Sequence, residues 1–234
     1  MKKDKEFDVV IVGGGHNGLI ASCYLALAGL RVLILEKNNH VGGATWSTYT
    51  FPGVDVRVSE YSYLISLLPQ KILSDLGISL EVRQRAVASF TPSIKDGISK
   101  GLLISNSSEE TTRNSFIKFT GDEREYEKYR ILQKKIAIFA RIVWPTMLSP
   151  LISKNELRER FKQKKEREIW DFIVEKPLSA LIEEHLSDDL VRGLVFTDAK
   201  IGHLTHPDDP TLIQNKTFLY HIIGQGTGEW RVPV

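Results

Sequence analysis

The hydrophobic pattern opens with a short β-branched run that leads into glycines. Residues 8–12 (Asp-Val-Val-Ile-Val) predict a strand buried on both faces of a parallel sheet, because no polar residue interrupts the run after Asp8. Apolar residues then recur at helical spacing as far as Gly29, a position typical of a left-handed helix cap. Residues 30–35 restore the strand pattern and end at Glu36. This order predicts a βαβ unit.

Glycines occupy the turn between the first strand and the helix. Gly13, Gly15 and Gly18 fit the G-x-G-x-x-G spacing, which combines a tight turn, close approach of a pyrophosphate and close packing of helix on strand. Glu36 ends the second strand, where a carboxylate accepts hydrogen bonds from a ribose diol and repels a 2′-phosphate. Together these features predict an ADP-binding unit. The alternative is an ordinary βαβ unit without a ligand.

A second glycine pair follows the acid after five residues, at Gly42 and Gly43. Glycine lets another backbone segment approach a phosphate, because no Cβ intrudes. The extended pattern resembles the flavoprotein superfamily of amine oxidases and carotenoid desaturases, and this resemblance implies FAD rather than NAD. The residues expected at the cofactor are Gly13, Gly15, His16, Asn17, Gly18, Glu36, Lys37, Gly42, Gly43, Ala44 and Thr45.

Three further stretches narrow the resemblance. Residues 15–19 (Gly-His-Asn-Gly-Leu), 51–53 (Phe-Pro-Gly) and 61–69 resemble the phytoene dehydrogenase-related group. That group includes bacterial carotenoid desaturases and ketolases and the pyridine nucleotide-disulfide oxidoreductase domain-containing protein 2. One departure is Ala44, where many superfamily members carry an arginine that contacts the cofactor.

The resemblance also places the 61–69 stretch beside the flavin. It implies that Tyr61, Ser62 and Tyr63 lie near the isoalloxazine ring or the mouth of the substrate site. The alternative is that the two tyrosines are core residues. No side chain is expected to be catalytic, because the flavin itself carries the reaction.

The remainder of the chain predicts a substrate region of mixed but mainly helical structure. Short strands are expected between residues 78 and 104, separated by turns at Pro92 and at residues 96–97. Helices are expected at 107–118, from Asp122 to Pro145, at 169–174, 178–186, 190–201 and 211–223. We therefore predict an α/β fold with a Rossmann-type FAD-binding part at 1–77, an α+β substrate region at 78–205 and a return segment toward the cofactor domain at 206–234.

Two neighbouring segments differ sharply in polarity, since one is apolar and the other is rich in charged residues. An apolar cluster surrounds Pro145 and Pro150, and residues 154–168 hold seven basic and four acidic side chains. Mixed charges at helical spacing are typical of a solvated helix face. The alternative is peripheral contact with an anionic membrane, which would bring an apolar substrate within reach.

Composition excludes several classes of protein. A net charge of +2 in 234 residues provides no global field for nucleic acid. Cys23 is the only cysteine, on a helix expected to be buried, so no intrachain disulfide or cysteine cluster can form. His203 and His206 flank a proline-bearing turn that does not hold them on one helix face, so no metal site is predicted. We expect a cytoplasmic protein with no membrane-spanning segment.

The resemblance finally implies that the chain is truncated. Members of the group are about twice as long and complete the flavin site with a late Gly-Asp segment, which is not found here. The expected function is transfer of a hydride from a C–H bond of a small apolar substrate to flavin N5, with an unidentified electron acceptor. The alternatives are an incomplete, non-catalytic fragment that needs a complementing polypeptide or a homo-oligomer, and a flavin amine oxidase.

Overall fold

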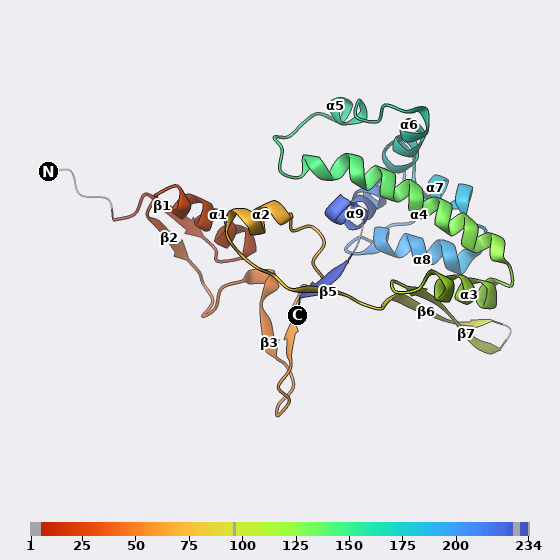
Figure 1. The fold of residues 1–234 in the computed structure, drawn as a ribbon, viewed down its shortest axis with the longest axis horizontal. Coiled ribbons are helices and arrows are strands. Elements are labelled where there is room, and N and C mark those ends of the chain that lie inside the picture. The colour runs from red at the N-terminus through yellow and green to blue at the C-terminus, as the bar shows by residue number, and fades with distance from the viewer. Residues whose placement is uncertain (1–5, 96, 227–229, 234) are drawn as a thin grey trace. The chain divides into compact units, whose positions relative to one another are not determined.

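The computed structural model describes residues 6–95, 97–226 and 230–233. These residues form two compact units, each considered by itself (Figure 1). Unit 1 comprises Met1–Leu64 and Gln70–Leu80, and unit 2 comprises Ile65–Pro69 and Glu81–Val234. The assignment of cofactor, substrate and return segments to 1–77, 78–205 and 206–234 stays a prediction.

Unit 1 contains the predicted βαβ unit. Strands β1 (Val9–Val12) and β2 (Val32–Leu35) pair in parallel, with Val9 opposite Val32 and Val12 opposite Leu35. Helix α1 (His16–Leu27) connects them, and Gly29 follows it in the left-handed region with a φ of 84°. The expected α/β architecture of this part is confirmed.

The predicted burial of β1 on both faces is wrong for this chain. Val10 is 53% exposed and Val12 is 85% exposed. Leu27 and Cys23 on α1 are also exposed, so the expectation of a buried helix around Cys23 fails as well. A parallel strand is buried on both faces only where further strands and covering layers surround it. The described sheet contains just β1 and β2.

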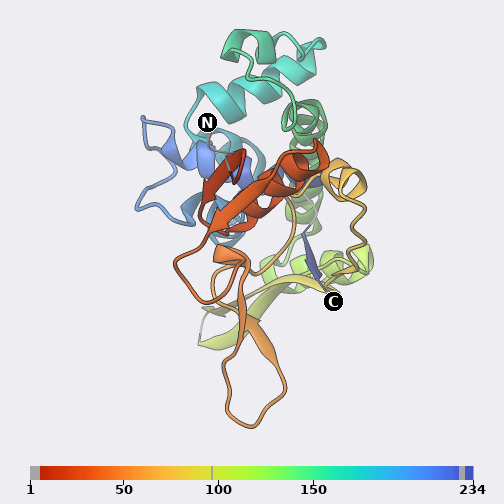
Figure 2. The same ribbon diagram turned by 90° about the vertical axis from the view of Figure 1, so that its left-hand side faces the viewer.

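The remainder of unit 1 is a hairpin and a short helix. Strand β3 (Ser47–Tyr49) pairs antiparallel with β4 (Arg57–Ser59), and a long loop joins them (Figure 2, orange). Gly53 has a φ of 77° in that loop, a backbone conformation that favours glycine. Helix α2 (Gln70–Asp75) follows, and its Asp75 carboxylate accepts a hydrogen bond from the Tyr24 hydroxyl of α1 at 2.8 Å.

Unit 2 contains two antiparallel strand pairs. Strand β5 (Val82–Gln84) pairs with β8 (Arg231–Pro233), and β6 (Val87–Lys95) pairs with β7 (Ile98–Ser105). The predicted turn at Pro92 is wrong, because Pro92 lies within β6 opposite Gly101. A two-stranded hairpin tolerates proline on its outer edge, where the missing N–H faces no partner strand. The other predicted turn lies at Gly97, and Asp96 is outside the described residues.

Three helices of unit 2 begin at residues whose side chains cap the first turn. The Ser108 hydroxyl accepts from the Thr111 N–H, the Asp122 carboxylate from the Arg124 N–H, and the Asp188 carboxylate from the Leu190 and Val191 N–H groups. The helices are α3 (Glu109–Thr120), α4 (Glu123–Val143), α5 (Lys154–Arg158), α6 (Lys164–Trp170), α7 (Leu178–His185), α8 (Asp189–Lys200) and α9 (Ile213–Ile222).

The region from 154 to 175 differs from the prediction. The expected helix at 169–174 does not stand alone, because α6 already begins at Lys164 and continues into a π-helical turn at Asp171–Glu175. Short 3-10 turns also occur at Gly43–Thr45, Trp144–Thr146 and Gly224–Gly226. Residues 227–229 and 234 of the predicted return segment lie outside the described residues.

The core of unit 2 is apolar and rich in aromatic residues. Phe139, Phe161 and Trp170 are almost completely buried, with ring centroids of successive pairs 5.1 to 6.4 Å apart. Helix α4 supplies Tyr126, Leu132, Ile136 and Phe139 to this core. Helix α4 packs against α3, α6, α7 and α9, and these four side chains belong to the shared buried core.

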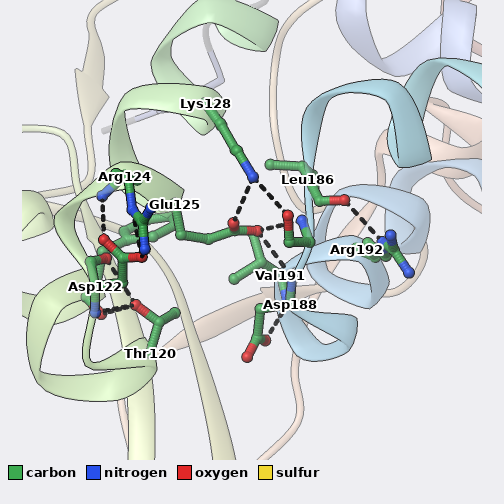
Figure 3. Close-up of polar contacts among 11 residues, drawn as sticks. Thr120, Asp122, Arg124, Glu125, Lys128, Leu186, Asp188, Val191 and Arg192 are labelled. Atoms are coloured by element: carbon green, nitrogen blue, oxygen red, sulfur yellow. Dashed lines mark hydrogen bonds and ion pairs between the residues drawn. The ribbon is translucent and has the colours of Figure 1, made fainter.

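A buried carboxylate joins α4 to the start of α8. Glu125 accepts hydrogen bonds from the backbone N–H groups of Ser187 at 2.7 Å and Asp188 at 2.9 Å (Figure 3). The Lys128 ammonium lies beside it and donates to the Ser187 hydroxyl. The negative charge of Glu125 therefore satisfies N–H groups that precede α8 and complements the helix dipole.

Two titratable groups of the helical core have shifted pKa values. Burial raises the pKa of the Asp198 carboxyl on α8 to about 6, although the nearby His221 imidazole acts in the opposite direction. Burial also raises the pKa of the Tyr129 hydroxyl on α4 to about 12, with Asp198 adding to the shift. Asp198 lies between the buried Val195 and Ala199 on one face of α8, which explains its desolvation.

We expect this carboxyl to make stability depend on pH. Because its folded pKa is above the unfolded value, the free energy of unfolding should fall as pH rises from about 4 to about 6 and then level off. Asp198→Asn should remove this dependence and stabilise the protein by about 1 to 2 kcal/mol at pH 7, after allowance for partial exposure. Urea titrations between pH 4 and 8 test this, with the exposed Asp208→Asn as control. An unchanged pH profile in Asp198→Asn would contradict the expectation.

Candidate nucleotide-binding site

The first glycine turn follows β1 directly. Gly13 has a φ of 101°, a conformation that other residues rarely adopt, and its N–H donates to the Leu35 carbonyl at 2.8 Å. A Cβ built on Gly18 would lie 2.3 Å from the Gly13 carbonyl oxygen. Gly13 and Gly18 are therefore required by the fold of the turn itself.

Gly15 occupies a different environment. It is the N-cap of α1, with a φ of −72° and a ψ of 171°, values that any residue adopts. A Cβ there would meet only the Gly43 Cα, at 3.9 Å. The fold of the described chain therefore gives no reason for glycine at position 15.

The N-terminus of α1 is suited to an anion. No side chain caps it, and its first turn contains no acid. The first N–H groups of a helix lack intrahelical acceptors, and the described residues supply none for His16 and Asn17. Helix termini of this kind bind phosphate through free N–H groups and the helix dipole.

The second glycine turn lies against the first. The Gly42 N–H donates to the Gly14 carbonyl at 2.7 Å, and Gly15 and Gly42 form a parallel bridge. Gly43 has a φ of 55°, and a Cβ on it would lie 2.9 Å from the Gly15 Cα. Two glycine segments that are distant in sequence thus share one small region beside the start of α1.

Glu36 holds this region together. Its Oε2 accepts from the Gly14 N–H at 2.6 Å, and its Oε1 accepts from the Asn38 N–H at 2.9 Å. The hydrogen bonds from Asn38 and then Gly14 lower the pKa of the carboxyl, so it stays ionised at neutral pH. Each carboxylate oxygen keeps further acceptor capacity for a ligand hydroxyl.

The other predicted residues surround these turns. The Thr45 hydroxyl donates to the Gly42 carbonyl at 2.8 Å, and the Ser62 hydroxyl donates to the Ala44 carbonyl at 2.7 Å. His16, Asn17 and Lys37 are exposed. Their roles in ligand binding stay predictions.

Tyr61 and Tyr63 do not belong to a core. Tyr61 is 74% exposed, and Tyr63 is also exposed. The alternative of two core aromatic residues is therefore wrong for this chain. Ser62 is the member of this trio that contacts the glycine-rich region, through Ala44.

Sequence patterns alone missed two features. Gly14 lies between the motif glycines, where a Cβ would come 3.0 Å from Val41 Cγ1 and 3.2 Å from Glu36 Oε2. His40 stacks on Trp46 with ring centroids 4.1 Å apart and an interplanar angle of 13°. The unbroken run of three glycines at residues 13–15 was a visible signal for Gly14. No spacing rule pairs a histidine with a tryptophan six residues later.

A metal cluster and a membrane-spanning helix each have requirements that can be compared with the described residues. No group of three or more histidine, cysteine, aspartate or glutamate side chains there could hold a metal ion. Across residues 6–95, 97–226 and 230–233, no helix is long and apolar enough to cross a membrane.

The geometry fits a dinucleotide. The chain combines glycine-rich turns, free N–H groups at the start of α1 and an acid directly after β2, and a βαβ unit binds a dinucleotide through these features. Residues 11–68 match the family described as NAD(P)-binding Rossmann-like domain. The chain therefore contains a Rossmann-like dinucleotide-binding domain.

Two curated relatives cover nearly the whole chain. An uncharacterized protein of Mycobacterium tuberculosis is 39% identical over 234 residues, which are 99% of this chain and 43% of that protein. The pyridine nucleotide-disulfide oxidoreductase domain-containing protein 2 of Rattus norvegicus is 26% identical over 246 residues, 95% of this chain and 42% of that protein. The predicted similarity to the latter protein is confirmed.

A solved structure of a putrescine oxidase variant has the same fold. It gives a TM-score of 0.50 at 20% identity and covers 97% of this chain and 46% of that chain. The chain spans less than half the length of each of these proteins. The family match and the solved structure agree on a Rossmann-like fold.

Proposed function

We propose that this chain is the cofactor-binding part of an FAD-dependent oxidoreductase of the phytoene dehydrogenase-related class. The observation that carries the proposal is the contact of two glycine turns beside the uncapped start of α1. The second turn, at Gly42 and Gly43, is the feature of the resemblance that favours FAD over a nicotinamide cofactor.

Particular groups would hold the ADP half of the cofactor. The N–H groups of His16 and Asn17 and the open backbone at Gly15 would face the pyrophosphate. The ionised Glu36 would accept hydrogen bonds from the adenosine ribose and reject a 2′-phosphate. Bound FAD supplies the oxidising power to accept a hydride from a substrate C–H bond.

The proposal extends to the substrate and the setting. The substrate would be a small apolar molecule, and a separate acceptor would remove the electrons. Completion of the flavin site by another polypeptide segment or a second copy belongs to the same proposal, because the relatives are more than twice as long. We also propose a cytoplasmic location, since a single cysteine is compatible with a reducing compartment.

Gly15→Ala separates ligand binding from folding. The added methyl group fits the described chain, so we expect an unchanged melting temperature. It would stand where the pyrophosphate approaches, so FAD affinity should fall at least tenfold. Fluorescence titration with FAD and thermal melting of the same samples provide the two measurements. Equal FAD affinity in both proteins would contradict the assignment of Gly15 to the ligand.

Anaerobic reduction of the reconstituted protein tests the reaction class. Bound FAD should lose its visible absorption when an apolar substrate with an activated C–H bond is added. Reduction by primary amines instead would favour the flavin amine oxidase, whose fold the chain shares. FAD binding without reduction by either substrate class would favour the incomplete, non-catalytic fragment.

A further inference from the structure

An exposed aliphatic segment follows the end of α4. Leu151 is fully exposed, and Met147 and Leu148 are exposed on the same stretch of chain. Pro150 lies among them and interrupts regular structure. Several large aliphatic side chains exposed in one short segment are typical of a surface that contacts an apolar phase or a partner.

A basic segment, residues 160–167, follows α5. It holds five basic residues and one acid, whereas the whole chain has a net charge of only +2. The single acid is Glu166, whose carboxylate accepts from the Gln163 N–H at 2.9 Å in a capping box. The exposed basic residues of the segment are Arg160, Lys162, Lys164, Lys165 and Arg167.

These five cations differ from their neighbours in α5. Lys154 pairs with Glu175 at 2.7 Å, and Arg158 pairs with Asp171 at 3.4 Å. Within the part of the chain that the structure describes, no acid forms an ion pair with any of the five. Both α5 and the basic segment are solvated, as the mixed charges predict, but the described ion pairs involve the cations of α5.

The segment is anchored rather than loose. Phe161 lies inside it and is almost completely buried, and Ile169 and Trp170 of α6 are buried just after it. The stretch from the end of α4 through α5 to α6 forms one outer border of unit 2 (Figure 1, green to teal). The apolar anchors therefore hold the basic side chains on the surface of the unit.

We propose that residues 147–167 dock on an anionic membrane surface. Leu148 and Leu151 would enter the boundary between headgroups and acyl chains, and the basic segment would contact lipid phosphates and carboxylates. Aliphatic insertion next to unpaired cations suits a lipid surface, whereas a nucleic acid would use the cations alone. The membrane contact does not rest on the proposed flavin chemistry.

Vesicle sedimentation tests the docking with the full chain and no cofactor. Vesicles of phosphatidylcholine with phosphatidylserine should sediment the protein, and vesicles of phosphatidylcholine alone should not. Lys164→Gln with Lys165→Gln should weaken binding about 25-fold, because each basic residue near the surface contributes about fivefold. Leu148→Ser with Leu151→Ser should weaken it at least tenfold.

Matched controls come from exposed positions elsewhere in unit 2. Lys134→Gln with Lys200→Gln removes two exposed cations, and Leu204→Ser removes an equally exposed leucine. Both variants should bind vesicles like the original chain. Absence of sedimentation with phosphatidylserine would overturn the proposal. The proposal would also be overturned if the leucine substitutions left vesicle binding unchanged and heparin displaced the protein. That result would indicate a general polyanion site.

Discussion

Gly18→Ala should disrupt the turn on which the nucleotide site depends. A Cβ at this position lies 2.3 Å from the Gly13 carbonyl oxygen, and neither atom belongs to a flexible side chain. Helix α1 must therefore move away from β1. We expect a loss of about 2 to 3 kcal/mol in the stability of this element and a fall of at least 100-fold in dinucleotide affinity, because the phosphate-facing N–H groups move with the helix.

Hydrogen exchange across residues 9–35 and titration with FAD measure the two effects. Gly193→Ala is the matched control, because nothing lies within 4 Å of a Cβ at that position in α8. Alanine there should stabilise the helix by about 0.5 to 1 kcal/mol. If Gly18→Ala left exchange and affinity unchanged, the close packing of α1 on the turn would be refuted.

Glu125→Ala should strongly destabilise unit 2. It removes the carboxylate that accepts from the Ser187 and Asp188 N–H groups and leaves Lys128 without its buried counter-charge (Figure 3). We expect a loss of about 3 to 4 kcal/mol, because buried donors remain unsatisfied. Urea denaturation followed by tryptophan fluorescence measures this loss.

Two variants show whether the hydrogen bonds cause the effect. Glu125→Gln keeps one acceptor oxygen at the Ser187 and Asp188 N–H groups, so its loss should be about half as large. Glu127→Ala removes a neighbouring exposed acid that pairs with Arg130 at 3.5 Å, and its effect should stay within about 0.5 kcal/mol. Equal losses in Glu125→Ala and Glu127→Ala would contradict the role of Glu125 at α8.

Local chemistry explains which parts of the fold were predictable. The caps at Ser108, Asp122 and Asp188 use side chains to bind backbone N–H groups a few residues away, so sequence alone locates them. The two glycine turns were predictable for the same reason. Their contact through Gly15 and Gly42 follows from the parallel pairing of β1 and β2, which places the ends of both strands at the same edge of the sheet.

The failures concern interactions between distant segments. Val12 is exposed because the described sheet has no strand beyond β1 and β2 to help bury it. The residues of β1 alone do not reveal how many strands surround it. Helix α6 begins early and passes into a π-helical turn at residues 171–175, where packing of Ile169 and Trp170 outweighs local propensity. The His40–Trp46 stack likewise depends on the path of the second glycine turn.

Calorimetric titration with ADP and with adenosine 2′,5′-bisphosphate tests the proposal that the glycine turns and Glu36 of this chain bind the ADP half of FAD. We predict one ADP site per chain, weakened in Gly15→Ala, and no measurable binding of the 2′-phosphorylated nucleotide because Glu36 repels it. Absence of ADP binding, or equal binding of both nucleotides, would contradict the account.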